Sequence, residues 1–393
     1  MNRKLLSVFF ICLSMIIVGC SNNNDAQKKD LNNEHNEQSI PPAPEPNYVS
    51  EIELEGDIRN VYYANEDKLL VSADKLYLYD VKTESVLNEA PIEDFEQENI
   101  WVADDGYVAV RLTRNSNDGK GNSMMSDSGF NMIVKFYDQD LKEVSDFFLN
   151  QLYEDNELLI SIDPISFSSD GKQMIYATSS ALYRYDFEKN EKSIVVDLTS
   201  EDIEKRSGIV SFEQIDFAHD DKQIVFKAQT FDIPVDPNKY SFSTCGVVNV
   251  DGSKLTNKTL GDYICSKITA YNDILLLSED PNIASGRTLV MELPEEKTKI
   301  HKLIDVSESG NVWGSNDGNY FATPIPTKTG WTIRIYDMKS GKLEGEHHVT
   351  IDGEKRYKEQ APVIKMVDDL RTYIVLLGSR RDDIPTKMVI GQF

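Results

Sequence analysis

The chain has 393 residues, and its 66 Asp and Glu against 41 Lys and Arg give a formal net charge of −25 at pH 7. This acidity argues against a nucleic-acid partner, because binding to phosphates needs a basic footprint. It also argues against adhesion to anionic lipids or wall polymers by charge alone. With 40% hydrophobic and 9% aromatic residues, the composition is that of a globular protein.

Residues 1–19 have the pattern of a secretory signal peptide. Arg3 and Lys4 precede a mostly apolar stretch, residues 5–18, which is shorter than the roughly 20 residues of a spanning helix. The stretch leads into Ile17-Val18-Gly19-Cys20, which resembles the lipobox of bacterial lipoproteins. The resemblance implies cleavage before Cys20 and lipidation of its thiol by a diacylglyceryl group with palmitate-type chains. The alternative is an ordinary signal peptide with an incidental cysteine.

Residues 20–47 predict a disordered tether behind the lipidated cysteine. They include Asn22-Asn23-Asn24 and a proline-rich segment, residues 41–46, and contain almost nothing apolar to bury. The Asn-rich half should be flexible and the proline half extended. Because the sequence shows no second spanning segment, we expect the folded domain to lie on the outer, extracytoplasmic face of the cell membrane.

From residue 48 onward a short strand, an acidic turn and a more apolar second strand recur, followed by a third and usually a fourth strand. Asp, Asn and Gly favour such tight hairpin turns. Repeats of this length with four strands each predict a β-propeller. The turns are centred on Asp67, Asp105, Asp170, Asp221, Asp273, Asp317 and Asp369. The predicted third strands are Lys75–Asp80, Met132–Asp138, Ala181–Asp186, Gly246–Asp251, Thr288–Leu293, Thr332–Asp337 and Lys387–Phe393.

The seventh repeat reaches Phe393 without sequence left for a fourth strand. Residues 48–55 form an orphan strand with the right alternation, and an open ring would leave two unpaired sheet edges. We therefore expect residues 48–55 to become the outer strand of the last blade. The prediction is an all-β, seven-bladed β-propeller over residues 48–393, closed by its N-terminal strand, with six or eight blades as alternatives.

One repeat carries a family resemblance. The segment 167–172, Phe-Ser-Ser-Asp-Gly-Lys, is followed by an apolar strand and then by residues 182–186, Leu-Tyr-Arg-Tyr-Asp. This pattern resembles the repeat of TolB-type and WD-like (WD40-like) bacterial propellers, and the likeness extends over residues 48–393. The Gly-His and Trp-Asp dipeptides of eukaryotic WD repeats are missing. The resemblance implies a fold and says little about function.

The sequence gives little support to catalysis. Propeller-containing peptidases need a Gly-x-Ser-x-Gly elbow, which does not occur. His347 and His348 are neighbours in a predicted strand, so their side chains point to opposite faces and a shared metal is not expected. We expect both to be surface residues. Residues 115–122 lack the acid that a calcium loop has at its twelfth position. We expect no catalytic residue, cofactor or metal. A propeller lyase or lactonase with an axial carboxylate site remains an alternative.

Cys245 and Cys265 are the cysteines of the predicted folded domain. Export favours their oxidation to a disulfide, but two buried free thiols are equally compatible with the sequence. Trp101 and Trp313 fall in predicted first strands near the axis, where core packing is expected. Trp331 falls instead at the end of a predicted loop.

Long loops give the functional prediction. Residues 114–131, 230–244, 279–287, 326–331 and 380–386 join second to third strands and, with the blade-to-blade links, should emerge on one face of the propeller. Long loops on a rigid scaffold are where binding usually resides. We expect a non-enzymatic binding or scaffold protein with a protein or peptide partner at the envelope. An envelope sensor that holds a small ligand in the axial channel is the alternative. The candidate partner contacts are Tyr240, Phe242, Trp331, Arg380 and Arg381.

Overall fold

The structure is a computed structural model, and its described residues all belong to the unit Ala43–Phe393. They form β-strands and one short 3-10 helix, η1 (Leu149–Leu152). No helix in this described part is long and apolar enough to cross a membrane. The described residues are 48–52, 54, 56–65, 68–91, 97–103, 108–114, 131–153, 164–201, 208–230, 243–258, 265–271, 273–279, 288–293, 297–301, 312–315, 317–351, 361–366, 372–378 and 386–392.

The described strands form seven antiparallel sheets of four strands each, and in six of these the strands pair in chain order. The first three are β2 (Asn60–Asn65), β3 (Lys68–Ser72), β4 (Lys75–Asp80) and β5 (Ser85–Pro91); β6 (Gln97–Val102), β7 (Val108–Arg114), β8 (Asn131–Tyr137) and β9 (Glu143–Phe148); and β10 (Ile165–Phe167), β11 (Gln173–Ala177), β12 (Ala181–Asp186) and β13 (Glu191–Asp197). The next three are β14 (Ile209–Ala218), β15 (Gln223–Thr230), β16 (Ser243–Asn249) and β17 (Thr256–Lys258); β18 (Cys265–Tyr271), β19 (Ile274–Glu279), β20 (Thr288–Glu292) and β21 (Lys297–His301); and β22 (Trp313–Gly314), β23 (Tyr320–Pro326), β24 (Gly330–Asp337) and β25 (Leu343–Thr350).

The remaining sheet joins the two ends of the described chain. Its strands β26 (Val363–Met366), β27 (Thr372–Leu377) and β28 (Lys387–Gln392) come from the C-terminal end. The fourth is β1 (Tyr48–Ile52), which pairs antiparallel with β28 from Tyr48 opposite Gln392 to Ile52 opposite Met388. The segment 48–55 was expected to pair here, and the strand ends at Ile52.

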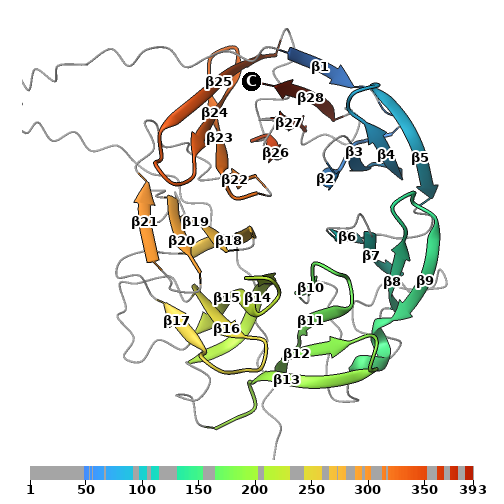
Figure 1. The fold of residues 1–393 in the computed structure, drawn as a ribbon, viewed down its shortest axis with the longest axis vertical. Coiled ribbons are helices and arrows are strands. Elements are labelled where there is room, and N and C mark those ends of the chain that lie inside the picture. The colour runs from blue at the N-terminus through green and yellow to red at the C-terminus, as the bar shows by residue number, and fades with distance from the viewer. Residues whose placement is uncertain are drawn as a thin grey trace, which may run out of the picture. The chain divides into compact units, whose positions relative to one another are not determined.

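The sheets lie side by side around a common centre (Figure 1). The first strand of each consecutive sheet is innermost, so β2, β6, β10, β14, β18, β22 and β26 surround that centre in chain order. An isolated parallel bridge between Ser315 and Met366 links the sixth sheet to the seventh.

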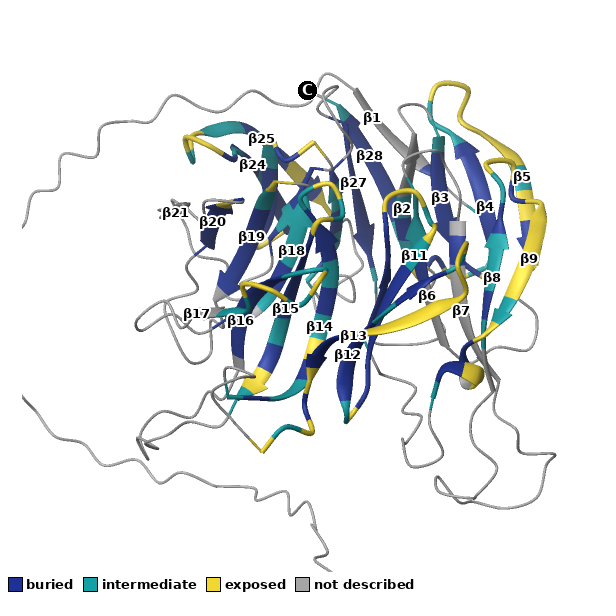
Figure 2. Ribbon diagram, turned by 60° about the horizontal axis from the view of Figure 1, so that its bottom comes forward, coloured by how far each residue is buried: buried dark blue, intermediate teal, exposed yellow. Residues whose placement is uncertain are grey.

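The apolar core lies between neighbouring sheets. One cluster joins Ile175 and Leu182 of the third sheet to Phe212, Ile224 and Phe226 of the fourth. All five are at most 6% exposed, and fully burying such a side chain stabilises the fold by about 1.5–3 kcal/mol. The outer strands differ, because β5 and β9 are mostly exposed (yellow in Figure 2). The first two sheets are therefore held mainly through their inner three strands.

The acidic turns connect successive sheets as well as successive strands. In the third sheet, the Ser168 hydroxyl donates to Oδ1 of Asp170 at 2.7 Å. The backbone N–H and hydroxyl of Ser169 donate to Oδ2 of Asp221, in the next sheet's turn, at 2.8 and 2.6 Å. Nδ1 of His219 in turn lies 2.6 Å from Oδ1 of Asp273 in the fifth sheet. Of the predicted turn centres, Asp67, Asp105 and Asp369 lie outside the described residues.

Two sequence expectations are wrong. The segment 326–331 is not a long loop: β23 reaches Pro326, β24 begins at Gly330, and Trp331 pairs with Pro326 inside the sheet. His347 is not a surface residue, because it is 7% exposed and hydrogen-bonded to the hydroxyl of Tyr373. Burial lowers the pKa of His347 to about 4. His348 is exposed, as alternation along β25 requires.

Candidate functional site

In two inner strands, β26 and β14, one face packs in the core between sheets and the other face carries a charged side chain. In β26, Ile364 and Met366 are buried in the core, whereas Lys365 between them is only half-buried. In β14, Ile215 and Phe217 are core residues and Asp216 lies on the opposite face. Because side chains alternate along a strand, Lys365 and Asp216 lie on the face opposite this core, and both belong to inner strands that surround the centre (Figure 1).

Polar and aromatic side chains collect at this centre, and we call this set the axial cluster. Strand pairing places most of them at one level, because each of six lies opposite the third residue of the second strand in its sheet. Lys267 is two residues before Thr269 on β18 and therefore lies on the same face. The axial cluster consists of Tyr62, Ser166, Asp216, Lys267, Thr269, Trp313 and Lys365.

Each axial lysine lies over an aromatic ring of the next inner strand. The Nζ of Lys267 is 5.4 Å from the centre of the Trp313 ring, and the Nζ of Lys365 is 5.5 Å from the centre of the Tyr62 ring. Both distances fall in the range of cation–π interactions. Neither ammonium has a carboxylate within ion-pair distance among the described residues.

The surroundings disfavour the charged form of both lysines. Burial lowers the pKa of Lys267. Burial, together with the positive charge of Lys267, lowers the pKa of Lys365 to about 8. Removal from water destabilises an ammonium, and a nearby like charge adds to this effect. Burial is the larger cause of the lowered Lys365 pKa, and the charge of Lys267 is the smaller one.

Asp216 is the described carboxylate of the axial cluster. Its Oδ1 accepts a hydrogen bond from the Ser166 hydroxyl at 2.7 Å and another from the Phe217 N–H at 2.9 Å. Burial nevertheless raises the pKa of Asp216 to about 6. Because hydrogen bonds to the charged form would lower it, desolvation is the larger effect. Within the described structure Asp216 is not in an ion pair with either lysine.

Tyr271 packs against the core between the fifth and sixth sheets. Its hydroxyl oxygen accepts a hydrogen bond from the Gly314 N–H at 2.7 Å, and burial raises the pKa of Tyr271. A Cβ atom at Gly314 would lie 2.4 Å from the Tyr271 ring. The close approach of ring and backbone explains why a glycine follows Trp313 here.

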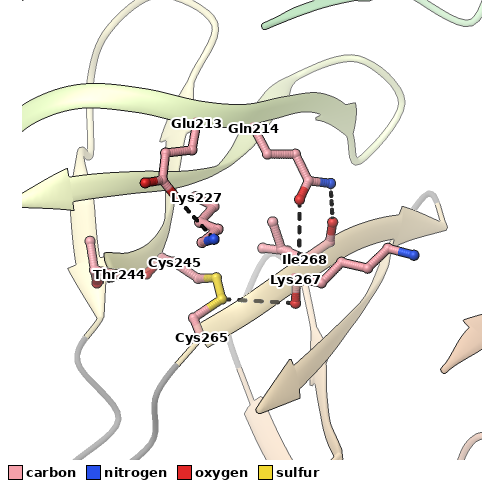
Figure 3. The surroundings of a disulfide bond; sticks show 8 residues. All are labelled: Glu213, Gln214, Lys227, Thr244, Cys245, Cys265, Lys267 and Ile268. Carbon is pink, nitrogen blue, oxygen red and sulfur yellow. Dashed lines mark hydrogen bonds and ion pairs between the residues drawn. A yellow bond between two sulfur atoms is a disulfide. The ribbon is translucent and has the colours of Figure 1, made fainter. Parts of the chain in front are cut away.

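A disulfide joins Cys245 of β16 to Cys265 of β18, with the Cα atoms 5.9 Å apart (Figure 3). It links the fourth sheet to the fifth. Beside it, the Gln214 amide is hydrogen-bonded to the backbone of Ile268. The Lys267 side chain extends away from the disulfide, whereas Lys227 reaches Glu213 with a separation of 2.8 Å (Figure 3).

A small pocket adjoins the disulfide. Its lining is almost entirely apolar and includes Ile268, Leu275 and Met291, which also belong to the core. Because none of the described residues that line it has an ionisable side chain, we assign no chemistry to this pocket.

The other predicted site residues have mixed outcomes. Trp331 is 5% exposed and packs in the core, so the prediction that it contacts a partner is wrong. Trp101 packs against Phe167 with ring centres 4.9 Å apart, and Trp313 packs partly on the core while facing Lys267. Outside the described residues lie Cys20, the predicted lipidation site, and the predicted contacts Tyr240, Phe242, Arg380 and Arg381.

The axial lysines, Lys267 and Lys365, were not predicted from the sequence to be site residues. The available signal was a lysine inside a short apolar strand, as in Val363-Ile364-Lys365-Met366. A lysine at such a position ordinarily faces solvent at a sheet surface. Only the arrangement of the sheets turns this face toward the centre.

No family model matches the sequence, and no curated protein matches it. Among solved structures, the chain is similar to the β-propeller domain of Cps50 (Swd1) from Myceliophteria thermophila. The TM-score is 0.56 with 12% sequence identity, and the match covers 88% of this chain and 100% of that chain. At this identity the likeness shows the fold alone. The prediction of an all-β propeller fold is thereby confirmed.

Proposed function

We propose that the protein is a lipid-anchored, extracytoplasmic binding protein whose propeller engages a protein or peptide partner. In this proposal the seven sheets are the blades of one ring. The pairing of β1 with β28 supports closure of that ring, because it covers an edge that an open sheet would leave unpaired.

The observation that carries this proposal is a difference between the two ends of the sheets. In an antiparallel sheet whose strands pair in chain order, first-to-second and third-to-fourth connections lie at one end. These are short turns, such as 219–222 and 187–190, and we call this end the tight-turn face. The other connections leave from the opposite end, which we call the long-connection face. They include 115–130, 231–242, 280–287 and 378–386.

Long segments on a rigid scaffold are favourable for binding. The predicted contacts Tyr240, Phe242, Arg380 and Arg381 fall in or beside these long connections, and aromatic and Arg side chains dominate interface hot spots. Trp331 is excluded from the proposed partner contacts, because it is buried. The short connection 327–329 offers no adjustable surface.

The disulfide supports an extracytoplasmic location. Disulfides persist in oxidising compartments, and this one lies near the strand ends from which 231–242 and 259–264 leave. A cross-link at that place fixes two neighbouring sheets where a long connection begins. The disulfide is therefore consistent with an extracytoplasmic location and with partner binding at the long-connection face.

Site-specific photocross-linking in cells tests the binding face. A photoreactive residue at Tyr240 or Arg381 should give the same cross-linked partner. Matched positions on the tight-turn face, Lys172 and Lys222, should give none. Cross-links from the tight-turn positions alone, or from no position, would overturn the proposed face.

A palmitate analogue tests the anchor separately. Labelling should disappear in Cys20→Ala and persist in the control Cys12→Ala, since Cys12 lies within the predicted signal peptide. Labelling that persists in Cys20→Ala would contradict lipidation at Cys20.

A small-ligand sensor is the second candidate function, and the axial lysine pair favours it. An axial lactonase site has less support. The described axial cluster offers two lysines and one carboxylate, whereas a hard divalent cation prefers several oxygen ligands.

A further inference from the structure

We propose that the axial cluster is a binding site for a small anion with a carboxylate or phosphate group, held between Lys267 and Lys365. This inference is independent of the partner on the long-connection face. It assigns a ligand chemistry to the centre of the propeller, where the sequence pattern gave none.

The geometry alternates cations and rings around the centre. Lys267 is on β18, Trp313 on β22, Lys365 on β26 and Tyr62 on β2, and these are four successive inner strands (Figure 1). Each ammonium lies over the ring of the following strand, at 5.4 and 5.5 Å. Two ammonium groups thus lie on either side of β22 and face a shared centre.

The chain does not supply a described counter-ion for this pair. It has 66 acidic residues, yet no carboxylate of the described residues lies within ion-pair distance of either Nζ. Asp216, the described axial carboxylate, is hydrogen-bonded to Ser166 instead. A half-buried positive pair without an anion is unfavourable, since buried charges are ordinarily paired.

A bound oxyanion would offset the unfavourable free energy of these two half-buried positive charges. A carboxylate or phosphate has several acceptor oxygens, so one group can accept hydrogen bonds from both ammoniums at once. In a partly desolvated place such charge-assisted bonds are stronger than in water. The rings of Trp313 and Tyr62 limit where each ammonium can lie, which preorganises the pair for a ligand.

The positive charge of the axial site contrasts with the negative net charge of the whole chain. At a net charge of −25, most of the surface repels anions. A small anion would bind where local positive charge overcomes that repulsion. In the described part of the chain, the outward-facing lysines Lys75, Lys135 and Lys172 each already have a Glu partner.

Calorimetric titration of the mature lipoprotein in detergent tests the proposal, with inorganic phosphate and succinate as probes. Sodium chloride keeps the ionic strength constant. The variants are Lys267→Met and Lys365→Met, and the matched control is Lys75→Met, which removes a lysine with a Glu89 partner. Thermal unfolding of each variant confirms that it is folded. If Lys365→Met does not fold, Lys365→Gln replaces it.

We expect at least one probe to bind the wild type and the Lys75→Met control equally. Each axial substitution should weaken that binding about tenfold or more, as expected for loss of one charge-assisted hydrogen bond. Binding of phosphate alone would identify a phosphate ligand, binding of succinate alone a carboxylate ligand, and binding of both a general oxyanion site. If neither probe binds at about 50 mM, a concentration at which a Kd of 1 mM gives near saturation, the proposal is overturned. Equal affinity in the axial variants would overturn it as well.

Discussion

The lysines at the outer side of the propeller and those at its centre have different partners. Lys75 on β4 is 2.9 Å from Glu89 on β5, and Lys135 on β8 is 2.7 Å from Glu143 on β9. Lys267 and Lys365 on inner strands lie over Trp313 and Tyr62 instead. Among the described residues neither axial lysine has a carboxylate within ion-pair distance, although the chain contains 66 acidic residues.

A lysine at the outer side of the propeller and a lysine at its centre therefore differ in what their charge contributes to folding stability. An exposed lysine in an ion pair contributes little to stability, typically 0–1 kcal/mol. A half-buried lysine without an anion destabilises the free protein, because its charge is poorly solvated. Such destabilisation persists where a ligand or another function requires the group.

The largest expected effect is that of Lys365→Met on stability. The pKa of Lys365 is about 8 in the folded protein, against an ordinary 10.5, so its charge destabilises the fold by up to about 3 kcal/mol. Because the folded-state pKa is the lower one, this cost is full below pH 8 and vanishes above pH 10.5. Lys365→Met should therefore stabilise the ligand-free protein at pH 7 and have little effect near pH 10.5.

Denaturant unfolding at both pH values measures this difference. Addition of a bound anion should reduce the advantage of Lys365→Met, since the anion stabilises only the wild type. A loss of stability in ligand-free Lys365→Met at pH 7 would mean that Lys365 already has a counter-ion.

Asp216→Asn should have the next largest effect, a stabilisation of about 2–3 kcal/mol at pH 7.5. Burial raises the pKa of Asp216 from 3.8 to about 6. The cost of its charge is therefore full above pH 6 and disappears below pH 3.8. Asn keeps an oxygen for the Ser166 hydroxyl. Unfolding curves of both proteins should converge as the pH falls toward 4. If Asn is destabilising at pH 7.5, then Asp216 is the counter-ion of the axial lysines.

Lys267→Met should have a smaller effect on Lys365. The positive charge of Lys267 lowers the pKa of Lys365, but burial is the larger cause. The substitution should therefore raise the pKa of Lys365 only part of the way back to its ordinary value. NMR titration of isotopically labelled lysine side chains measures this. An unchanged pKa would show that the two ammoniums are too far apart to share one anion.

Lys75→Met should have the smallest effect, below about 1 kcal/mol at pH 7. Its ion pair with Glu89 is partly exposed, with side-chain exposures of 36% and 52%, so water already solvates both charges. Unfolding in low and high salt measures the small difference. A loss as large as the gain expected for Lys365→Met would remove the contrast between outer and inner lysines.

Much of the fold could be predicted because the repeats have a strong local pattern. The predicted third strands Lys75–Asp80 and Ala181–Asp186 have the observed bounds, since acidic turns and alternating apolar residues delimit them. In the fourth repeat the strand begins at Ser243 rather than Gly246. Its first residues are polar and join the sheet through backbone pairing, which a hydrophobic pattern does not reveal.

The error at Trp331 has a physical reason. Pro324 and Pro326 weaken the strand pattern before the predicted loop 326–331, because proline cannot donate a backbone hydrogen bond. In the structure β23 continues through both prolines to Pro326. The short connection 327–329 then returns the chain, and Trp331 is drawn into the core.

The axial cluster could not be predicted from sequence for a different reason. Lys267 and Lys365 belong to different repeats, and nothing local distinguishes them from lysines at a sheet surface. Their proximity depends on how the fifth, sixth and seventh sheets are placed around the centre. Burial and mutual repulsion, which mark the pair, arise only from that placement.

The most direct test of an axial anion site is the number of protons taken up when succinate binds at pH 8. Succinate has no group that titrates near this pH, and a Lys365 pKa of about 8 leaves about half of the molecules without the proton. An anion between the lysines should favour the ammonium, so calorimetry in two buffers of different ionisation enthalpy should show uptake of up to about half a proton per succinate. The same titration of Lys365→Met should show almost none. Binding without proton uptake in the wild type, or equal uptake in Lys365→Met, would contradict the account.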